Sequence, residues 1–195
     1  MAMSALGNGL SDAQRHEDAL PVKEAELAML RRLGVSARNL LVAQANLATT
    51  YKALGQLDEA EPLLREVHFG YLRLNGLEHE HTLQTANNYA SLLFDLNRFE
   101  EAKTLLRKAM PVARRFLGDS HQDTLRIRWT YAAVIALDAT RGIDDLREAV
   151  TTLEDTERIA RRVLGGAHPT TMGVGSCLQG ARAALAARET PSASK

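Results

Sequence analysis

The stretch Asn75–Phe116, NGLEHEHTLQTANNYASLLFDLNRFEEAKTLLRKAMPVARRF, is a pattern that the rest of the chain repeats. Its apolar residues have the spacing of two helices joined by a short turn at residues 96–98. A glycine marks each return of the pattern, after steps of 42, 42 and 47 residues: Gly34, Gly76, Gly118 and Gly165. Such self-similarity is typical of stacked repeats, which bury their apolar faces against their neighbours. We therefore predict an all-α solenoid.

Small residues inside the predicted helices keep the same step. They are Ala48, Ala90 and Ala132 in the first helix of each unit, and Ala60, Ala102 and Ala149 in the second. The two alanines of a unit are 12 residues apart in the first two units and 17 apart in the third. Insertions in repeat proteins map to loops, so we place the extra residues in the turn around residues 138–145. We expect the alanines to be buried where the helices of a unit approach closely.

The repeat predicts a single domain over residues 11–188 with about eight helices. It divides into a half unit at 11–34, units at about 35–75, 76–117 and 118–164, and a half unit at 165–188. Residues 1–10 and 189–195 are expected to be disordered. Because the first half unit lacks a partner helix, Val22, Leu27 and Leu30 are predicted to form an uncapped apolar stripe. Another segment is expected to cover this stripe, or the chain to form a weak homodimer through its terminal helices.

Charge and composition argue against several classes of function. The chain has 24 basic and 24 acidic residues, so no overall field attracts nucleic acid or an anionic membrane. The lone Cys177 excludes an internal disulfide and a metal site built from cysteines. We find neither a signal peptide nor an apolar run near the roughly 20 residues that span a bilayer. The expected location is the cytoplasm.

Several repeated positions resemble the tetratricopeptide repeat (TPR). They are Asn46–Ala48, Tyr51, Gly55 and Ala60 in the first unit, and Asn88–Ala90 with Ala102 in the second. The TPR period is about 34 residues, and the longer period here resembles the kinesin-light-chain type. That type has a Leu-Gly-x-x-His-Pro-x-Thr linker, which is similar to Leu117–Thr124 and Leu164–Thr171. The resemblance covers about residues 11–188 and implies a right-handed superhelix of helix-turn-helix repeats.

The resemblance also implies a concave groove, lined by the first helix of each unit, that binds an extended peptide. The side chains that it places there are Lys52, Gln84, Asn87, Ser91, Phe94, Arg126 and Trp129. Asn87 is expected to hydrogen-bond a peptide backbone, and Phe94 and Trp129 to anchor apolar groups. Arg126 is expected to hold an acidic group. The alternative for Trp129 is a position in the core.

Three features that could indicate other chemistry also have a structural explanation. Glu78–His81 contains metal-ligand residue types, but its histidine at 79 recurs as His121 and His168, which predicts a role at the repeat junctions. Basic pairs such as Arg114-Arg115 lie at the ends of second helices, where cations favour the helix dipole. Cys177 is interpreted as a packing residue, and no nucleophile with a base can be placed. We predict no metal, no cofactor and no enzyme activity.

The leading functional hypothesis is a non-enzymatic protein–protein interaction module. It binds a peptide segment of a partner protein in the groove, with no nucleic acid or membrane partner. One alternative is a structural module that self-assembles through the ends of its stack. A second alternative is the detached sensor domain of a signalling NTPase.

Overall fold

The computed structural model describes residues 2–138 and 141–189. Within these ranges the chain forms nine α-helices and no strand, as expected for an all-α protein. The chain divides into two compact units, Met1–Leu96 and Asn97–Lys195.

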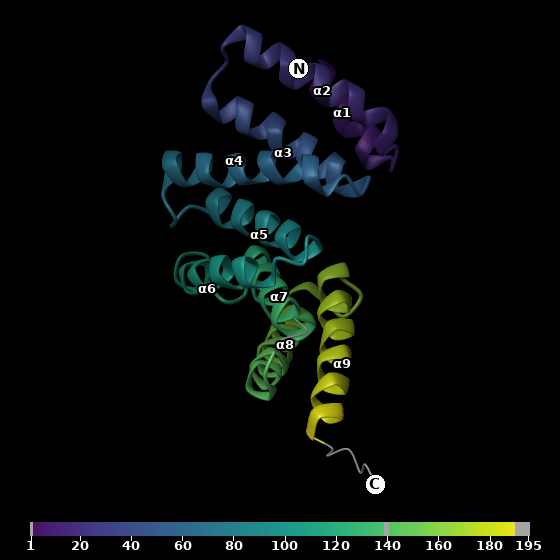
Figure 1. The fold of residues 1–195 in the computed structure, drawn as a ribbon. Coiled ribbons are helices and arrows are strands. Elements are labelled where there is room, and N and C mark those ends of the chain that lie inside the picture. Colours follow the sequence, from purple (N-terminus) through teal and green to yellow (C-terminus); the bar gives the residue numbers. More distant parts are fainter. Residues whose placement is uncertain (1, 139–140, 190–195) are drawn as a thin grey trace. The chain divides into compact units, whose positions relative to one another are not determined.

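In residues 2–96 the chain forms five helices. Their bounds are Ala2–Asp12 for α1, His16–Leu33 for α2, Ala37–Ala53 for α3, Leu57–Asn75 for α4 and Glu80–Asp95 for α5. Each helix packs against the next one along the chain, and α1 also contacts α3 (Figure 1). Leu27 of α2 is buried with Ala43 and Leu47 of α3. This succession of neighbouring contacts is the packing of a helical repeat array.

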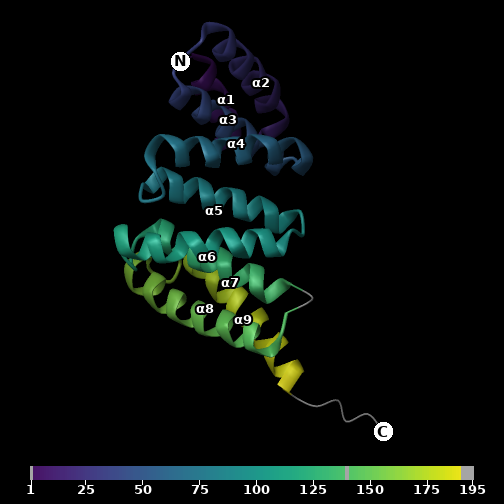
Figure 2. The ribbon, with the colours of Figure 1, turned by 60° about the vertical axis from the view of Figure 1, so that its left-hand side comes forward.

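The second unit has four helices in the part that the structure describes. Their bounds are Phe99–Phe116 for α6, Gln122–Leu137 for α7, Ile143–Leu164 for α8 and Pro169–Glu189 for α9. Helix α7 packs against α6 and α8, and α9 lies beside both α8 and α7 (Figure 2). Leu125, Ile159 and Ala160 form part of the core between these helices. The predicted tail at 189–195 begins with the last residue of α9, and the rest of it lies outside the described residues.

The repeated alanines lie in the interior of the two units. All six of them have no exposed surface: Ala48, Ala60, Ala90, Ala102, Ala132 and Ala149. Their predicted burial is confirmed. The insertion in the third unit is only partly in the turn. The α7–α8 connection covers residues 138–142 against 54–56 for α3–α4, and Ala149 is the seventh residue of α8 whereas Ala60 is the fourth of α4.

The histidines at the repeat junctions cap helices. His79, His121 and His168 each accept a hydrogen bond at Nδ1 from the backbone N–H two residues later, at 3.2 Å. This bond satisfies one of the free N–H groups at a helix start. The predicted structural role of these histidines is therefore confirmed as a bond within each junction.

The glycine and the threonine of the linker complete the junction. Gly76 and Gly118 have φ angles of 77° and 91°, in the left-handed region that glycine adopts most readily. Thr82 Oγ1 donates to the carbonyl of Tyr71 at 3.2 Å, and Thr124 Oγ1 donates to that of Ala113 at 3.3 Å. Each threonine thus ties the start of one helix to the end of the helix before it.

Residues 2–10 are helical, so the expectation of disorder over residues 1–10 is wrong for them, and residue 1 lies outside the described residues. Helix α1 approaches α2 closely at Gly7, where a Cβ would lie only 3.0 Å from Cγ of Lys23. Ser4 donates a hydrogen bond to the Glu26 carboxylate, which further ties α1 to α2. Small residues and glycines have low helix propensity, and packing on α2 overrides it. The helix missing from the first half unit is therefore α1.

The apolar stripe expected on α2 is largely covered within the chain. Leu27 is 4% exposed, and Leu30 is half-buried against the same cluster. Val22 faces α1, since its Cγ1 would lie 3.6 Å from a Cβ on Gly7. The segment that covers the stripe is thus part of this chain.

Candidate functional site

The first helices of two successive repeats, α3 and α5, are joined by Lys52. Its Nζ donates to Ser91 Oγ at 2.7 Å and lies 2.9 Å from Asp95 Oδ2. About a third of each charged side chain is exposed, and pairs of this kind contribute roughly 0–1 kcal/mol. The structure thus brings two of the predicted groove residues together and adds Asp95, which the sequence did not point to.

Asn87 of α5 is a buried amide with an unused acceptor. It is 6% exposed, and its Oδ1 has no hydrogen-bond partner among the described residues. Leaving a buried acceptor without a donor costs about 1–3 kcal/mol. Gln84 and Phe94, also predicted for the groove, lie on the same helix and are half-buried. The Oδ1 atom of Asn87 is therefore suited to accept a hydrogen bond from an N–H group of a bound molecule.

A hollow of about 370 Å³ lies among α1, α2 and α3, and we call it the N-terminal pocket. Its lining residues are Ser4 and Asn8 of α1, Glu26 and Leu30 of α2, and Asn39, Val42, Ala43 and Asn46 of α3. The lining combines amide side chains with apolar ones, and Val42 is 46% exposed. The sequence did not point to this pocket because one of its walls is α1, which was expected to be disordered.

A buried polar network holds the walls of the N-terminal pocket together. Lys23 is 4% exposed, and its Nζ donates to Ser11 Oγ at 2.7 Å and to Thr50 Oγ1 at 2.9 Å. Burial lowers the pKa of Lys23, and the negative charges of Asp12 and Glu26 oppose this shift. Because its partners lie on α1 and α3, the Lys23 ammonium links three helices.

In the second unit, Trp129 of α7 packs against α9. A Cβ on Gly173 would lie 2.3 Å from Cη2 of the indole, so the ring occupies the space that the glycine leaves open. The indole also hydrogen-bonds the Cys177 thiol, whose pKa is raised by burial despite this bond. Trp129 and the predicted Arg126 are both half-buried. The Trp129 indole thus packs against α9 on one side, and part of its surface stays exposed.

Arg128 is a buried cation to which the sequence did not point. It is 6% exposed, and its guanidinium lies 3.8 Å from Asp155 and 4.0 Å from Asp119. Burial lowers its pKa, and the positive charge of Arg114 adds to this, whereas the two carboxylates oppose it. The available signal was its place in the repeat, two units after the buried Gln44.

Residues 40–81 and 81–139 each match a family described as tetratricopeptide repeat. None of the curated proteins matches the chain. Within the ranges that the structure describes, no helix has both the length and the apolar character needed to cross a membrane.

Several solved structures share the fold. Nearly identical TPR-like repeats from Podosopora anserina, described as a kinesin light chain, are 23% identical with a TM-score of 0.79, covering 96% of this chain and 87% of theirs. BtubC (BKLC) from P. vanneervenii is 15% identical with a TM-score of 0.61, covering 99% and 83%. A Rap protein complexed with Competence and Sporulation Factor is 17% identical with a TM-score of 0.55, covering 93% and 52%. At these identities the likeness concerns the fold.

Proposed function

We propose, from the premise that this chain belongs to the tetratricopeptide-repeat family, that it binds an extended segment of a partner protein in the N-terminal pocket. The family is one of interaction scaffolds, which supports a role without catalysis. The Rap protein, whose fold is similar, was solved with Competence and Sporulation Factor. That complex supports a ligand-binding role for this chain too.

The observation that carries the proposal is the mixture of amides and apolar groups in one pocket. Asn8, Asn39 and Asn46 reach it from two helices. An amide side chain offers both donors and an acceptor, which is what the backbone of an extended peptide requires. Leu30 and Val42 supply the apolar surface for an anchoring side chain. A volume of about 370 Å³ is within the usual range of ligand sites.

Charge makes the proposal more specific. Of the eight residues that line the pocket, Glu26 is the only charged one. A buried carboxylate favours a positive or N–H-rich group nearby, since an anion beside it would be repelled. We therefore favour a segment with an apolar anchor flanked by Lys or Arg at this pocket.

The residues predicted for the groove remain part of the proposal within their own units. In the first unit, Asn87 is suited to accept from a ligand N–H, whereas Lys52 and Ser91 already bond each other. In the second unit, half-buried Arg126 and Trp129 offer a guanidinium and an indole edge. An acidic and apolar segment would suit that pair.

The test is a selection of displayed random peptides against the purified chain, followed by affinity measurement with synthetic copies of the selected peptides. Val42→Glu places a second carboxylate in the pocket that Glu26 lines and removes an apolar contact. We expect it to weaken binding about tenfold or more, as at other interface hot spots. Asn46→Ala is expected to weaken the same peptides less, because only hydrogen bonds to an amide are lost.

Leu33→Glu is the matched control. Leu33 is also an exposed apolar residue of the first unit, at 67%, and it is not among the residues that line the pocket. Its variant should bind the selected peptides as the wild type does, and circular dichroism should show the same helicity for all variants. Selected peptides that bind Val42→Glu with unchanged affinity would show that the pocket is not the binding site.

A further inference from the structure

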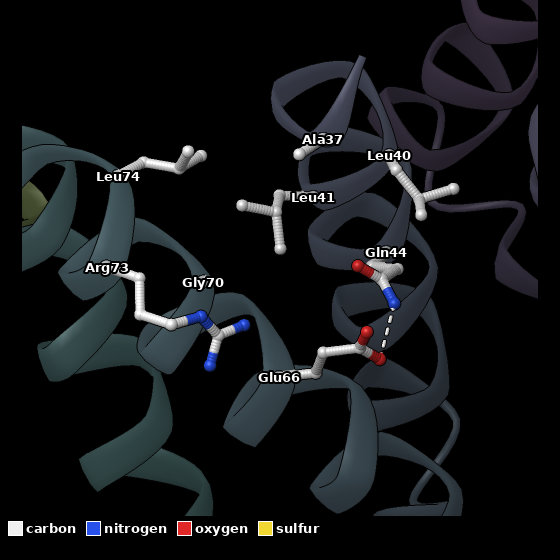
Figure 3. Close-up of a pocket in the computed structure, with 8 residues that line it drawn as sticks. All are labelled: Ala37, Leu40, Leu41, Gln44, Glu66, Gly70, Arg73 and Leu74. Atoms are coloured by element: carbon white, nitrogen blue, oxygen red, sulfur yellow. Dashed lines mark hydrogen bonds between the residues drawn. The ribbon is translucent and has the colours of Figure 1, made fainter. Parts of the chain in front are cut away.

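A second cavity of the first unit lies between α3 and α4, and we call it the α3–α4 cavity (Figure 3). Its volume is about 150 Å³, and a protein cavity of about this size can hold benzene. The residues that line it are Ala37, Leu40, Leu41 and Gln44 of α3, and Glu66, Gly70, Arg73 and Leu74 of α4. It shares no lining residue with the N-terminal pocket, so a ligand here would be a separate function.

Gln44 presents an unsatisfied acceptor at this cavity. The residue has no exposed surface, and its Nε2 donates to Glu66 Oε2 at 2.7 Å. This bond fixes the orientation of the amide, because a carboxylate can only accept. The carbonyl Oε1 therefore points away from Glu66 (Figure 3), and it has no partner in the part of the chain that the structure describes. Buried acceptors are normally satisfied, so this position suits a donor on a bound molecule.

Two opposite charges lie at the same cavity. Figure 3 shows the side chains of Glu66 and Arg73 both extending from α4 toward α3, where the Glu66 carboxylate meets Gln44. Both charged residues are exposed, so a ligand can reach them from solvent. The guanidinium of Arg73 has the planar fork that binds a carboxylate with two hydrogen bonds. The carboxylate of Glu66 suits an ammonium group.

The rest of the lining is apolar and closely packed. Leu40, Leu41 and Leu74 contribute side chains, and Leu74 is 50% exposed. Leu41 packs directly on Gly70, since a Cβ at this glycine would lie only 2.5 Å from Cδ2 of Leu41. The cavity thus offers the Gln44 carbonyl and the Glu66 carboxylate to a positively charged group. It offers the Arg73 guanidinium to a negatively charged group and apolar surface to a side chain.

We propose that the α3–α4 cavity binds a free apolar α-amino acid. The ammonium donates to Gln44 Oε1 and to the Glu66 carboxylate, and the carboxylate of the ligand pairs with Arg73. An aliphatic side chain of the size of leucine packs on Leu41 and Leu74. A free amino acid carries both charged groups next to one side chain, whereas either end of a peptide carries only one of them.

Calorimetric titration of the full chain with leucine, leucinamide and N-acetyl-leucine tests this proposal. We expect saturable binding of leucine. Each blocked analogue should bind about tenfold or more weakly, because it lacks one charge-assisted interaction. Arg73→Gln should weaken leucine binding by a similar factor. Arg65→Gln is the control, since Arg65 is an exposed arginine of the same helix and does not line the cavity.

Gln44→Leu gives an independent result, because its partner Glu66 is exposed and can bond water once the amide is removed. It should lose leucine binding while its helicity is kept. Absent leucine binding, or equal binding by Arg73→Gln, would overturn the proposal. Leucinamide binding as tightly as leucine would point to a peptide N-terminus and would overturn the assignment to a free amino acid. An ordered water alone on Gln44 Oε1, in a crystal soaked with leucine, would also overturn it.

Discussion

His68 is a buried imidazole of α4 in the first unit. It is 2% exposed, and its ring stacks on Tyr89 of α5 with the centroids 6.2 Å apart. Its Nδ1 has no hydrogen-bond partner within residues 2–138 and 141–189. Burial lowers the pKa of His68 below its ordinary value of 6.5. The neutral ring is thus the form that this packing favours.

We predict that protonation of His68 destabilises the chain at mildly acidic pH. Since its pKa is lower in the folded chain, the unfolded chain binds the proton first as the pH falls. The contribution of His68 is fully present above pH 6.5 and is lost as the pH falls below this value. Urea midpoints should therefore fall more steeply with decreasing pH for the wild type than for His68→Phe, which keeps an aromatic ring.

His81 provides the control for this measurement. It is an exposed histidine of α5, so His81→Phe should keep the pH dependence of the wild type. The same slope for the wild type and His68→Phe would contradict the prediction. The repeat position of His68 does not reveal this behaviour, because burial depends on the helix that packs over it.

At the scale of elements, α1 changes the interpretation of the N-terminal half. Through Ser4 and Asn8 it forms a wall of the N-terminal pocket, and through Ser11 it holds the buried Lys23. Without this helix, α3 would present an open face, and Glu26 would lose the hydrogen bond from Ser4. The proposed binding site therefore depends on a helix that the sequence pattern did not predict.

Two glycines of α9 allow a test of how this helix packs against Trp129. We predict that Gly173→Ala displaces the indole of Trp129, because the new Cβ would lie 2.3 Å from Cη2. Overpacking of this kind costs roughly 1–3 kcal/mol, partly offset by the better helix propensity of alanine, about 1 kcal/mol. The melting temperature should fall, and tryptophan emission should shift to the red with stronger acrylamide quenching.

Gly180→Ala is the matched control on the same helix. A Cβ at Gly180 meets no atom of the described residues within 4 Å. This variant should therefore be as stable as the wild type or slightly more so, with unchanged emission. Unchanged emission in Gly173→Ala as well would mean that Trp129 does not pack on α9.

At the scale of the whole molecule, the two units are expected to respond separately to damage. The stability of a repeat array is approximately a sum of local terms. Leu146 is fully buried in the second unit, and Leu64 is 3% exposed in the first. Each Leu→Ala change should cost about 2–5 kcal/mol. Leu146→Ala should lower hydrogen-exchange protection in residues 97–189 far more than in 2–96, and Leu64→Ala should do the reverse.

Equal loss of protection across the chain in both variants would contradict this prediction. It would mean that the molecule unfolds as one cooperative body rather than unit by unit. The comparison of the two variants is needed, since a single variant could lower global stability without showing where opening begins.

The repeat family could be predicted from the sequence because the residues that define the repeat act through short-range interactions. The family matches confirm the predicted tetratricopeptide repeat, and the solved structures confirm the TPR-like fold with repeats like those of kinesin light chains. Glycines with positive φ, capping histidines and buried alanines act within one junction or one helix pair. Their spacing in the chain therefore predicts their structural role directly.

The candidate binding sites could not be predicted from residue spacing, because they depend on contacts between different helices. Gln44 meets Glu66, and Lys23 meets Thr50, only because particular helices pack together. Whether an amide is left without a partner is decided by every atom around it. The same holds for α1, which is helical through its packing on α2 rather than through its own propensity. The amino-acid sequence by itself determined the repeat, its period and its core columns, whereas the tertiary structure decided the N-terminal pocket, the α3–α4 cavity and the surroundings of Trp129.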